Sequence, residues 1–429
     1  MSALRHMALW PQLRSPRYAL LLVTLGFSLV RARDQPGFDV SIGNTVATVV
    51  PGDLLLAALA VTSLVAFARR GLPREAWGAI AAAVAFCGIV IGTAAFNGTA
   101  AFVSAVKLVE LAALGLGAVA LVRSRPQVEA LVDVLLLFTI AADIFGFAKF
   151  VAGGGGRQAS FLGEHDFAAL ATLPLVYGLA RAFERRPDAR AWTAIVAGAA
   201  GCILGAALAS LVGLYLGTIV LVVGASLRRR ATLRAFAVTA VVVAAVSAAT
   251  LFLRAGDLGF LQQWFGKPPS RPGQYAASWS QRLIYVYVGG RIFLAKPALG
   301  TGWYGDLPPK TFVAYLPDAR DRFTDQPANY FPPPDSPFIP QQTWDQILYE
   351  LGVIGGLAML ALLVALVRAC RRAARRTRDL LADLPGVWVA SSIGALAGEG
   401  FFGGTPLAAT FWLVAGVAVA VPLISRRSS

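Results

Sequence analysis

Arginines gather in alternate gaps between the long apolar stretches of this chain, and the intervening gaps are not basic. The basic gaps hold Arg14 and Arg17; Arg69, Arg70 and Arg74; Arg123 and Arg125; Arg181, Arg185, Arg186 and Arg190; Arg228, Arg229, Arg230 and Arg234; the run from Arg368 to Arg378; and Arg426 and Arg427. Cytoplasmic loops of membrane proteins carry an excess of Lys and Arg. The alternation therefore predicts a chain that crosses a membrane many times, with every basic gap inside.

Composition agrees with a membrane protein. The chain is 57% hydrophobic and 14% charged, with a mean hydropathy of +0.65, whereas a soluble domain carries about 25% charged residues. The net charge of +15 lies in short loops that can face anionic lipid. Since no basic and aromatic groove pattern accompanies it, we expect membrane lipids and no nucleic acid as partners. The three cysteines form no Cys-x-x-Cys pair, and we expect no metal and no cofactor.

We predict an all-α, polytopic integral membrane protein with about twelve transmembrane helices in a single domain over residues 1–429. The spans are 18–32, 50–68, 76–95, 100–122, 128–151, 166–183, 192–208, 210–227, 235–253, 346–367, 385–402 and 406–424. An even count puts both termini in the cytoplasm. The stretch 192–227 must be a hairpin turning near Ala209, because one helix would put Arg185 and Arg228 on opposite sides.

The longest outward loop, residues 254–343, lies between the ninth and tenth spans. It is rich in Pro, Gly and aromatic residues, and disordered segments are poor in aromatics, so we expect order. Within it, residues 281–295 predict a helix at the membrane surface that ends at Lys296-Pro297.

Three outward clusters offer chemistry. After four glycines comes Arg157, whose planar fork suits a phosphate, then His165, either a catalyst or a solvated residue, and Asp166, which we expect to cap the following helix. In the long loop, Arg282 and Arg291 are nine residues apart, about two and a half helical turns. One can hold an anion while the other snorkels to headgroups, or both can be interfacial anchors.

The third cluster begins the tenth span. Gln342, Asp345, Gln346 and Tyr349 recur at helical spacing, and a polar face that enters a membrane tends to line a cavity. Glu399, which has no nearby charge partner in the sequence, is a further candidate for substrate binding.

Residues 157–367 resemble the O-antigen ligase and O-antigen polymerase superfamily of bacterial inner-membrane proteins. A family pattern near the end of the large periplasmic loop reads His-Asn-x-x-Leu-x-x-Leu-x-Glu-x-Gly-x-x-Gly, and residues 341–355 keep its second half. An upstream Arg followed by Pro-x-x-Gly-x-Gly and an earlier Arg-x-x-Gly-x-x-Gly-x-x-Asn are the other two family patterns. The matching residues are Arg282, Pro297, Gly300 and Gly302 for the first, and Arg157, Ser160, Gly163 and Asp166 for the second.

The resemblance implies transfer of a glycan from a polyprenyl-diphosphate carrier to an acceptor, with inversion and without a metal. By that resemblance, arginines hold the diphosphate and a loop histidine assists the acceptor hydroxyl. Two departures stand out. The family histidine falls on Gln341, which cannot act as a base, and a Ser-Arg-Gly segment at the start of the eighth span reads Ser210-Leu211-Val212-Gly213 without Arg.

The family roles can therefore have moved, the substrates can differ, or catalysis can be lost. The candidates for catalysis are Arg282, Gln341, Asp345 and His165, and those for substrate binding are Arg157, Arg291, Gln342, Trp303 and Glu399.

We favour a ligase that transfers the glycan to a lipid A-core acceptor. A polymerase acting on a second lipid-linked glycan is the alternative within the family. A transporter or flippase is the alternative outside it, because charges lie within the spans: Lys107, Glu110, Asp133 and Asp143. A non-catalytic partner in envelope assembly is the third.

Overall fold

The computed structural model describes residues 8–153, 155–184, 188–228, 232–255, 277–324, 326, 328–331, 333, 335, 342–377 and 379–424. The helices are α2 (Leu9–Gln12), α3 (Pro16–Ser28), α4 (Pro51–Arg70), α5 (Arg74–Ala95), α6 (Thr99–Val109), α7 (Ala112–Leu121), α8 (Arg125–Ala152), α9 (Glu164–Glu184), α10 (Ala189–Gly205), α11 (Leu208–Leu227), α12 (Leu233–Leu253), α14 (Ala277–Ala295), α15 (Pro309–Val313), α16 (Leu316–Arg322), α17 (Thr343–Arg376), α18 (Leu384–Ala395) and α19 (Pro406–Ile424). Short 3-10 turns η1 (Ala32–Asp34), η2 (Ala328–Tyr330) and η3 (Leu380–Ala382), and strands β1 (Phe38–Ile42) and β2 (Thr45–Val49), complete the described elements.

Nine spans in the described part of the chain are long and apolar enough to cross a membrane: α4, α5, α6 continued by α7, α8, α9, α11, α12, α17 and α19. The predicted all-α integral membrane protein is confirmed in this general form. The other three predicted spans coincide with α3, α10 and α18, which have 13, 17 and 12 residues. Because about 20 residues are needed to span a bilayer, the count of twelve stays a prediction.

Ion pairs join the basic gaps to one another at one end of the bundle. Arg125, at the start of α8, contacts Glu184 at the end of α9 and Asp379 after α17, at 3.0 and 3.1 Å. Further pairs at this end join Arg190 to Glu129 and Asp133, Arg228 to Asp383, and Arg376 to Glu75. The basic segments between helices, which the arginine pattern assigns to the cytoplasmic side, therefore lie together at one end of the bundle.

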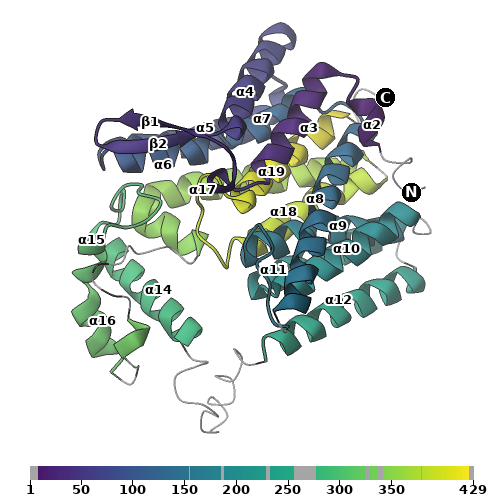
Figure 1. The fold of residues 1–429 in the computed structure, drawn as a ribbon. Coiled ribbons are helices and arrows are strands. Elements are labelled where there is room, and N and C mark those ends of the chain that lie inside the picture. Colours follow the sequence, from purple (N-terminus) through teal and green to yellow (C-terminus); the bar gives the residue numbers. More distant parts are fainter. Residues whose placement is uncertain are drawn as a thin grey trace.

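The opposite end carries the hairpin β1–β2 and the helices α14, α15 and α16, whereas α2 lies at the basic end (Figure 1). The antiparallel strands pair Phe38 with Val49 and Ile42 with Thr45. Gly43 has φ 61°, which fits the first position of a two-residue hairpin loop. The predicted spans leave residues 33–49 as a connecting loop; the alternating polar and apolar residues of Phe38–Ile42 are the signal for a strand.

The stretch 192–227 folds as the expected hairpin. Helix α10 ends at Gly205 and α11 begins at Leu208, so the turn falls at Ala206 and Ala207, slightly before the predicted position. Ala206 has φ 44°, a left-handed conformation that ends the helix.

Helix α14 contains the predicted helix 281–295 and begins four residues earlier. Together with α15, α16 and Tyr330, it packs a second apolar core that includes Ile284, Val288 and Phe312. This part of the long loop therefore has its own folded interior.

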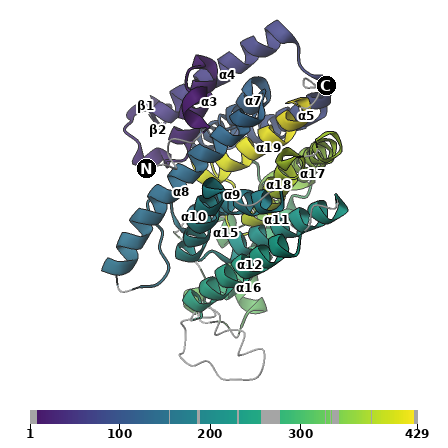
Figure 2. The same cartoon turned by 90° about the vertical axis from the view of Figure 1, so that its right-hand side faces the viewer.

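Helices α9 and α19 occupy the centre of the bundle, enclosed by their neighbours (Figure 2). Each begins at the non-basic end. The first turn of α9 carries Glu164, His165 and Asp166, so these polar groups enter the interior of the protein and do not face lipid.

Candidate active site

Two motifs that are separate in the sequence form one contact. Helix α17 is broken at Gly352, which has φ 62° and ψ −159°. At the break, the amides of Val353 and Ile354 donate to the carbonyls of Pro297 and Ala298, at 2.8 and 3.1 Å. The Pro-x-x-Gly-x-Gly turn after α14 thus supplies the acceptors that the broken helix lacks.

Glycine is required on both sides of this contact. A Cβ on Gly300 would lie 2.4 Å from the carbonyl oxygen of Tyr349, and a Cβ on Gly352 would lie 2.5 Å from the carbonyl of Ala298. The amide of Thr301 donates to the carbonyl of Tyr349 at 2.9 Å. The turn therefore packs backbone against backbone on α17.

Glu350 belongs to the same joint. Its carboxylate accepts a hydrogen bond from Gln346 Nε2 at 3.1 Å and lies near the backbone amides of Tyr304 and Gly305. Gln346 Oε1 accepts from the amide of Phe401 at 2.6 Å. Both Gln346 and Glu350 are completely buried. Gln346 and the glutamate of the family pattern together therefore link α17 to the turn after α14 and to the segment after α18.

The segment after α18 is held against the start of α17. The amide of Thr343 donates to the carbonyl of Leu396 at 3.2 Å, and its hydroxyl donates to the carbonyl of Glu399 at 2.8 Å. A Cβ on Gly398 would lie 2.2 Å from that of Ala209. Glu399 therefore sits between the beginnings of α11 and α17.

Four arginines from four segments lie near Glu399 or His165: Arg31 after α3, Arg157 before α9, Arg254 after α12 and Arg282 on α14. Arg157, Arg254 and Arg282 are close enough to His165 to act on its charge. Arg31, Arg157 and Arg282 act in the same way on Glu399. We call these four arginines with His165, Asp166 and Glu399 the arginine cluster.

Ion pairs and hydrogen bonds hold three of the arginines. Arg31 contacts Asp166 at 2.8 Å. Arg157 contacts Glu164 at 2.7 Å, donates to the carbonyl of Gly205 at 3.1 Å and lies 3.4 Å from His165 Nε2. The buried Arg254 donates to the carbonyl of Ala206 at 3.3 Å, which ties the end of α12 to the turn before α11.

Arg282 differs from the other three. Among the described residues it makes no hydrogen bond or ion pair, although it is partly buried. Burial and the charge of Arg254 lower the pKa of Arg282, and Glu399 opposes this. A half-buried cation beside other cations is unfavourable until an anion joins it. The cluster is therefore suited to bind a group with more than one negative charge.

Arg291 faces elsewhere, as the nine-residue spacing allowed. It is 48% exposed and contacts Asp318 on α16 at 2.7 Å, and Tyr287 donates to the same carboxylate at 3.2 Å. Arg291 therefore joins α14 to α16, on the face of α14 away from the arginine cluster.

Glu399 and His165 each present an unsatisfied polar atom. Among the described residues, neither Glu399 Oε2 nor His165 Nδ1 has a hydrogen-bond partner, and both atoms are buried. Burial, followed by the charge of Asp166, raises the pKa of Glu399, and the nearby arginines oppose the rise. A Cβ on Gly398 would lie 3.7 Å from His165 Nδ1, so the glycine brings the two groups near each other.

Of the remaining predicted site residues, those that the structure describes lie outside the cluster. Gln341 falls outside the described residues, and Gln342 precedes α17. Asp345 lies against α14, where a Cβ on Gly289 would be 2.8 Å from its Oδ1. Trp303 is completely buried in the main core, and its backbone bonds to Thr93 and Asn97. Trp303 therefore supports the turn after α14 from within.

The sequence reasoning overlooked Arg31 and Arg254 as site residues. Both stand in outward gaps, where the charge pattern predicts few arginines, and that departure is the signal. Asp166 was expected to cap α9, but α9 begins at Glu164. Instead, Asp166 Oδ1 accepts from the amide of Leu407 at 2.9 Å, in the first turn of α19.

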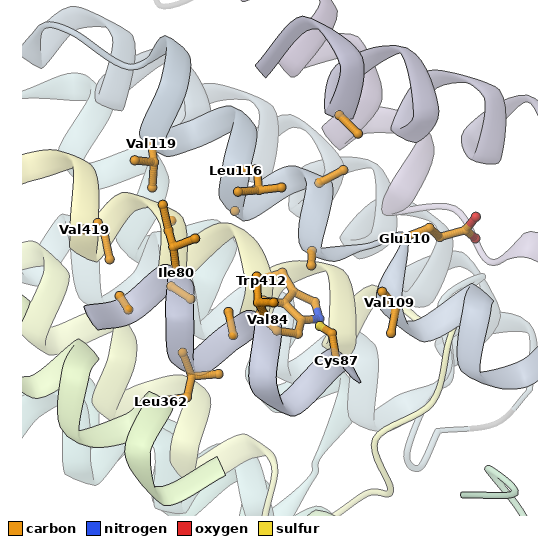
Figure 3. Close-up of a pocket in the computed structure, with 18 of the residues that line it drawn as sticks. Ile80, Val84, Cys87, Val109, Glu110, Leu116, Val119, Leu362, Trp412 and Val419 are labelled. Atoms are coloured by element: carbon orange, nitrogen blue, oxygen red, sulfur yellow. The ribbon is translucent and has the colours of Figure 1, made fainter. Parts of the chain in front are cut away.

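A separate apolar pocket of about 470 Å³ lies between α4, α5, α7, α17 and α19. Figure 3 shows Ile80, Leu116, Leu362 and Trp412 around it, with Glu110 at one end. No member of the arginine cluster lines it. Its size and composition suit a hydrocarbon chain. Among the described residues, no group of three His, Cys, Asp or Glu side chains is placed to hold a metal ion.

A family model described as O-antigen ligase matches residues 193–361. This stretch is therefore similar to the O-antigen ligase family. The predicted resemblance to the O-antigen ligase and polymerase superfamily is confirmed. No curated protein matches the chain. The matched stretch contains Arg254 and Arg282, whereas Arg31, Arg157, His165 and Glu399 come from segments before and after it. The cluster therefore joins the matched stretch to the rest of the bundle.

Proposed function

We propose that this protein is an inverting, metal-independent glycosyltransferase of the ligase type at the periplasmic face of the bacterial inner membrane. It moves a glycan from a polyprenyl-diphosphate carrier to a lipid A-core acceptor. Twelve spans with both termini in the cytoplasm put the arginine cluster on the periplasmic side, where polyprenyl-linked glycans are presented. The match to the O-antigen ligase family and the membrane-spanning helices support the general activity.

The observation that carries the proposal is the position of Arg282. It lies among like charges and, among the described residues, without an ion pair, which is what a diphosphate site requires before its ligand arrives. In the reaction, an acceptor hydroxyl oxygen bonds to the anomeric carbon as the bond from that carbon to the diphosphate breaks. The departing diphosphate takes the electron pair and gains charge, and Arg282 with Arg254 stabilises it.

The other residues have supporting roles. Arg157, held by Glu164, sits between the diphosphate site and His165. His165 is placed to donate a hydrogen bond to a substrate oxygen through Nδ1. Asp345, Gln341 and Gln342 stay candidates for contacts with the acceptor at the start of α17, and the apolar pocket is a place for a lipid chain.

The test compares Arg282→Ala with the matched control Arg291→Ala in a deletion strain. Both arginines lie on α14 and differ in the face they occupy. We expect Arg282→Ala to abolish glycan transfer at normal membrane levels of the protein, and Arg291→Ala to keep most of it. Surface polysaccharide is separated on a gel. A fully active Arg282→Ala variant at normal levels would contradict the proposal.

The same deletion strain separates the alternatives. Glycan chains of normal length that are detached from lipid A-core indicate a ligase, and the absence of long chains indicates a polymerase. For a transporter, purified protein in vesicles would move solute and form no new glycosidic bond.

A further inference from the structure

We propose that Glu399 is the general base of the transfer, in place of the histidine that the family pattern has at Gln341. This inference rests on the proposed function and names a catalytic residue for it. A base must lie in the site, keep a free oxygen for the acceptor hydroxyl and be able to lose its charge there. We compare the described carboxylates and the histidine near the arginine cluster against these three requirements.

The other carboxylates near the cluster are occupied. Asp166 uses one oxygen for Arg31 and the other for the amide of Leu407, at 2.8 and 2.9 Å. Glu164 contacts Arg157 at 2.7 Å. A carboxylate that already neutralises an arginine is a weak proton acceptor, because protonation would break the ion pair.

Asp345 has no such partner among the described residues, but it lies in the wrong place. It rests against Gly289 of α14, and none of the four arginines is among the groups that act on its charge. A base at Asp345 would therefore be remote from the diphosphate site.

His165 is in the right place, but its environment opposes a gain of charge. Its Nε2 lies 3.4 Å from a guanidinium nitrogen of Arg157, which can only donate. Arg254 and Arg282 add two further cations. An imidazole that accepts a proton becomes a cation itself, so this cluster disfavours His165 as the base.

Glu399 meets each condition. It lies within reach of Arg31, Arg157 and Arg282, its Oε2 has no partner among the described residues, and its backbone is fixed by Thr343. On attack, the hydroxyl oxygen bonds to the anomeric carbon, the hydroxyl proton passes to the Glu399 carboxylate, and the diphosphate departs with the electron pair of the broken bond. The charge of Glu399 disappears while that of the diphosphate grows beside the arginines.

The test uses the full-length protein in vesicles, with a polyprenyl-diphosphate-linked glycan and lipid A-core. We expect Glu399→Gln to reduce kcat about 10²- to 10⁴-fold, the usual contribution of a positioned base, with little change in donor binding. Glu399→Asp should recover part of the rate. The control is Asp321→Asn, an exposed carboxylate on α16, which should keep the rate of the unaltered protein.

The pH profile separates a base from a structural residue. Burial and Asp166 raise the pKa of Glu399, and a base acts in its ionised form. The kcat of the unaltered protein should therefore rise as pH passes upward through this raised pKa. The residual rate of Glu399→Gln should lack that rise, since His165, Asp166 and the arginines that face Glu399 are unchanged in the variant.

Two results would overturn the inference: a Glu399→Gln variant with kcat within about threefold of the unaltered protein, or one that keeps the same rise with pH. If Arg282→Ala is inactive and Glu399→Gln is active, the proposed function stands and the base lies elsewhere. If Arg282→Ala is active, the proposed function fails. Should Glu399→Gln not reach the membrane, Glu399→Asp carries the test: a kcat equal to that of the unaltered protein would reject the base, because the shorter side chain moves the carboxylate away from the hydroxyl.

Discussion

The guanidinium of Arg31 lies 2.8 Å from the carboxylate of Asp166, which is 135 residues further along the chain. Arg31 reaches it across Gly163, where a Cβ would lie 1.8 Å from Arg31 Nη2. The second oxygen of Asp166 accepts from Leu407. One buried carboxylate therefore joins the loop after α3, the start of α9 and the start of α19.

Arg31→Ala should lower stability strongly, because it leaves Asp166 buried without its cation. Breaking a buried ion pair from one side typically costs about 3–5 kcal/mol. The measurement is thermal unfolding of detergent-purified protein. Arg33→Ala is the control, since the Arg33 side chain is 73% exposed and its loss should change stability by less than about 0.5 kcal/mol. Equal melting temperatures for the two variants would refute this role of Arg31.

Gln346→Leu should separate α17 from the segment after α18. The change leaves Glu350 without one donor and the amide of Phe401 without its acceptor, at about 1–3 kcal/mol for each buried unsatisfied group. Leu348→Ala on the more exposed face of the same helix is the comparison. Both unfolding and glycan transfer are measured. We expect Gln346→Leu to lower both the melting temperature and the rate of glycan transfer. Unchanged values of both would contradict a structural role for the contacts of Gln346 with Glu350 and Phe401.

Gly352→Ala should be far more harmful than Gly356→Ala, although the two glycines are one helical turn apart. At Gly352 a side chain meets the carbonyl of Ala298 at 2.5 Å and the backbone has a positive φ, whereas at Gly356 the nearest atom is a flexible Leu348 methyl at 3.4 Å. We expect Gly352→Ala to lower the free energy of unfolding by more than about 3 kcal/mol, which is the upper end of the range for strained backbone positions. The measurement compares the membrane level and the melting temperature of the two variants, and both should be lower for Gly352→Ala.

The orientation of the chain is open to direct labelling. In a variant without Cys87, Cys202 and Cys370, a cysteine at Val46 in the exposed hairpin should react with a membrane-impermeant maleimide applied to intact spheroplasts. A cysteine at Thr232, in the basic gap before α12, should react only after lysis. The reversed pattern would place the arginine cluster in the cytoplasm, and the proposed function would then fail.

Much of the bundle was predictable because a bilayer restricts the chain to few solutions. Apolar length and the arginine pattern locate the helices, and Arg125, Glu184 and Asp379 meet at the basic end as that pattern requires. The hairpin at 192–227 also followed from charge alone. These features depend on local sequence and on the membrane.

The site was less predictable because its contacts join distant segments. Asp166 reads as a cap for the helix that follows it, yet it binds α19, which is 241 residues away. Trp303 was a candidate for substrate binding, yet its side chain is completely buried in the main core. Arg282 was identified from its motif, whereas its neighbour Arg254 had no motif and was found only through the fold.

The scattered origin of the arginine cluster has a consequence for synthesis. Arg31 leaves the ribosome first, but the backbone that shares its partner Asp166 belongs to α19, the last described helix. A chain that stops before α19 therefore lacks one of the two partners of Asp166, however well its early helices insert. The contacts of this buried carboxylate are complete only after α19 has been made and has packed against α9.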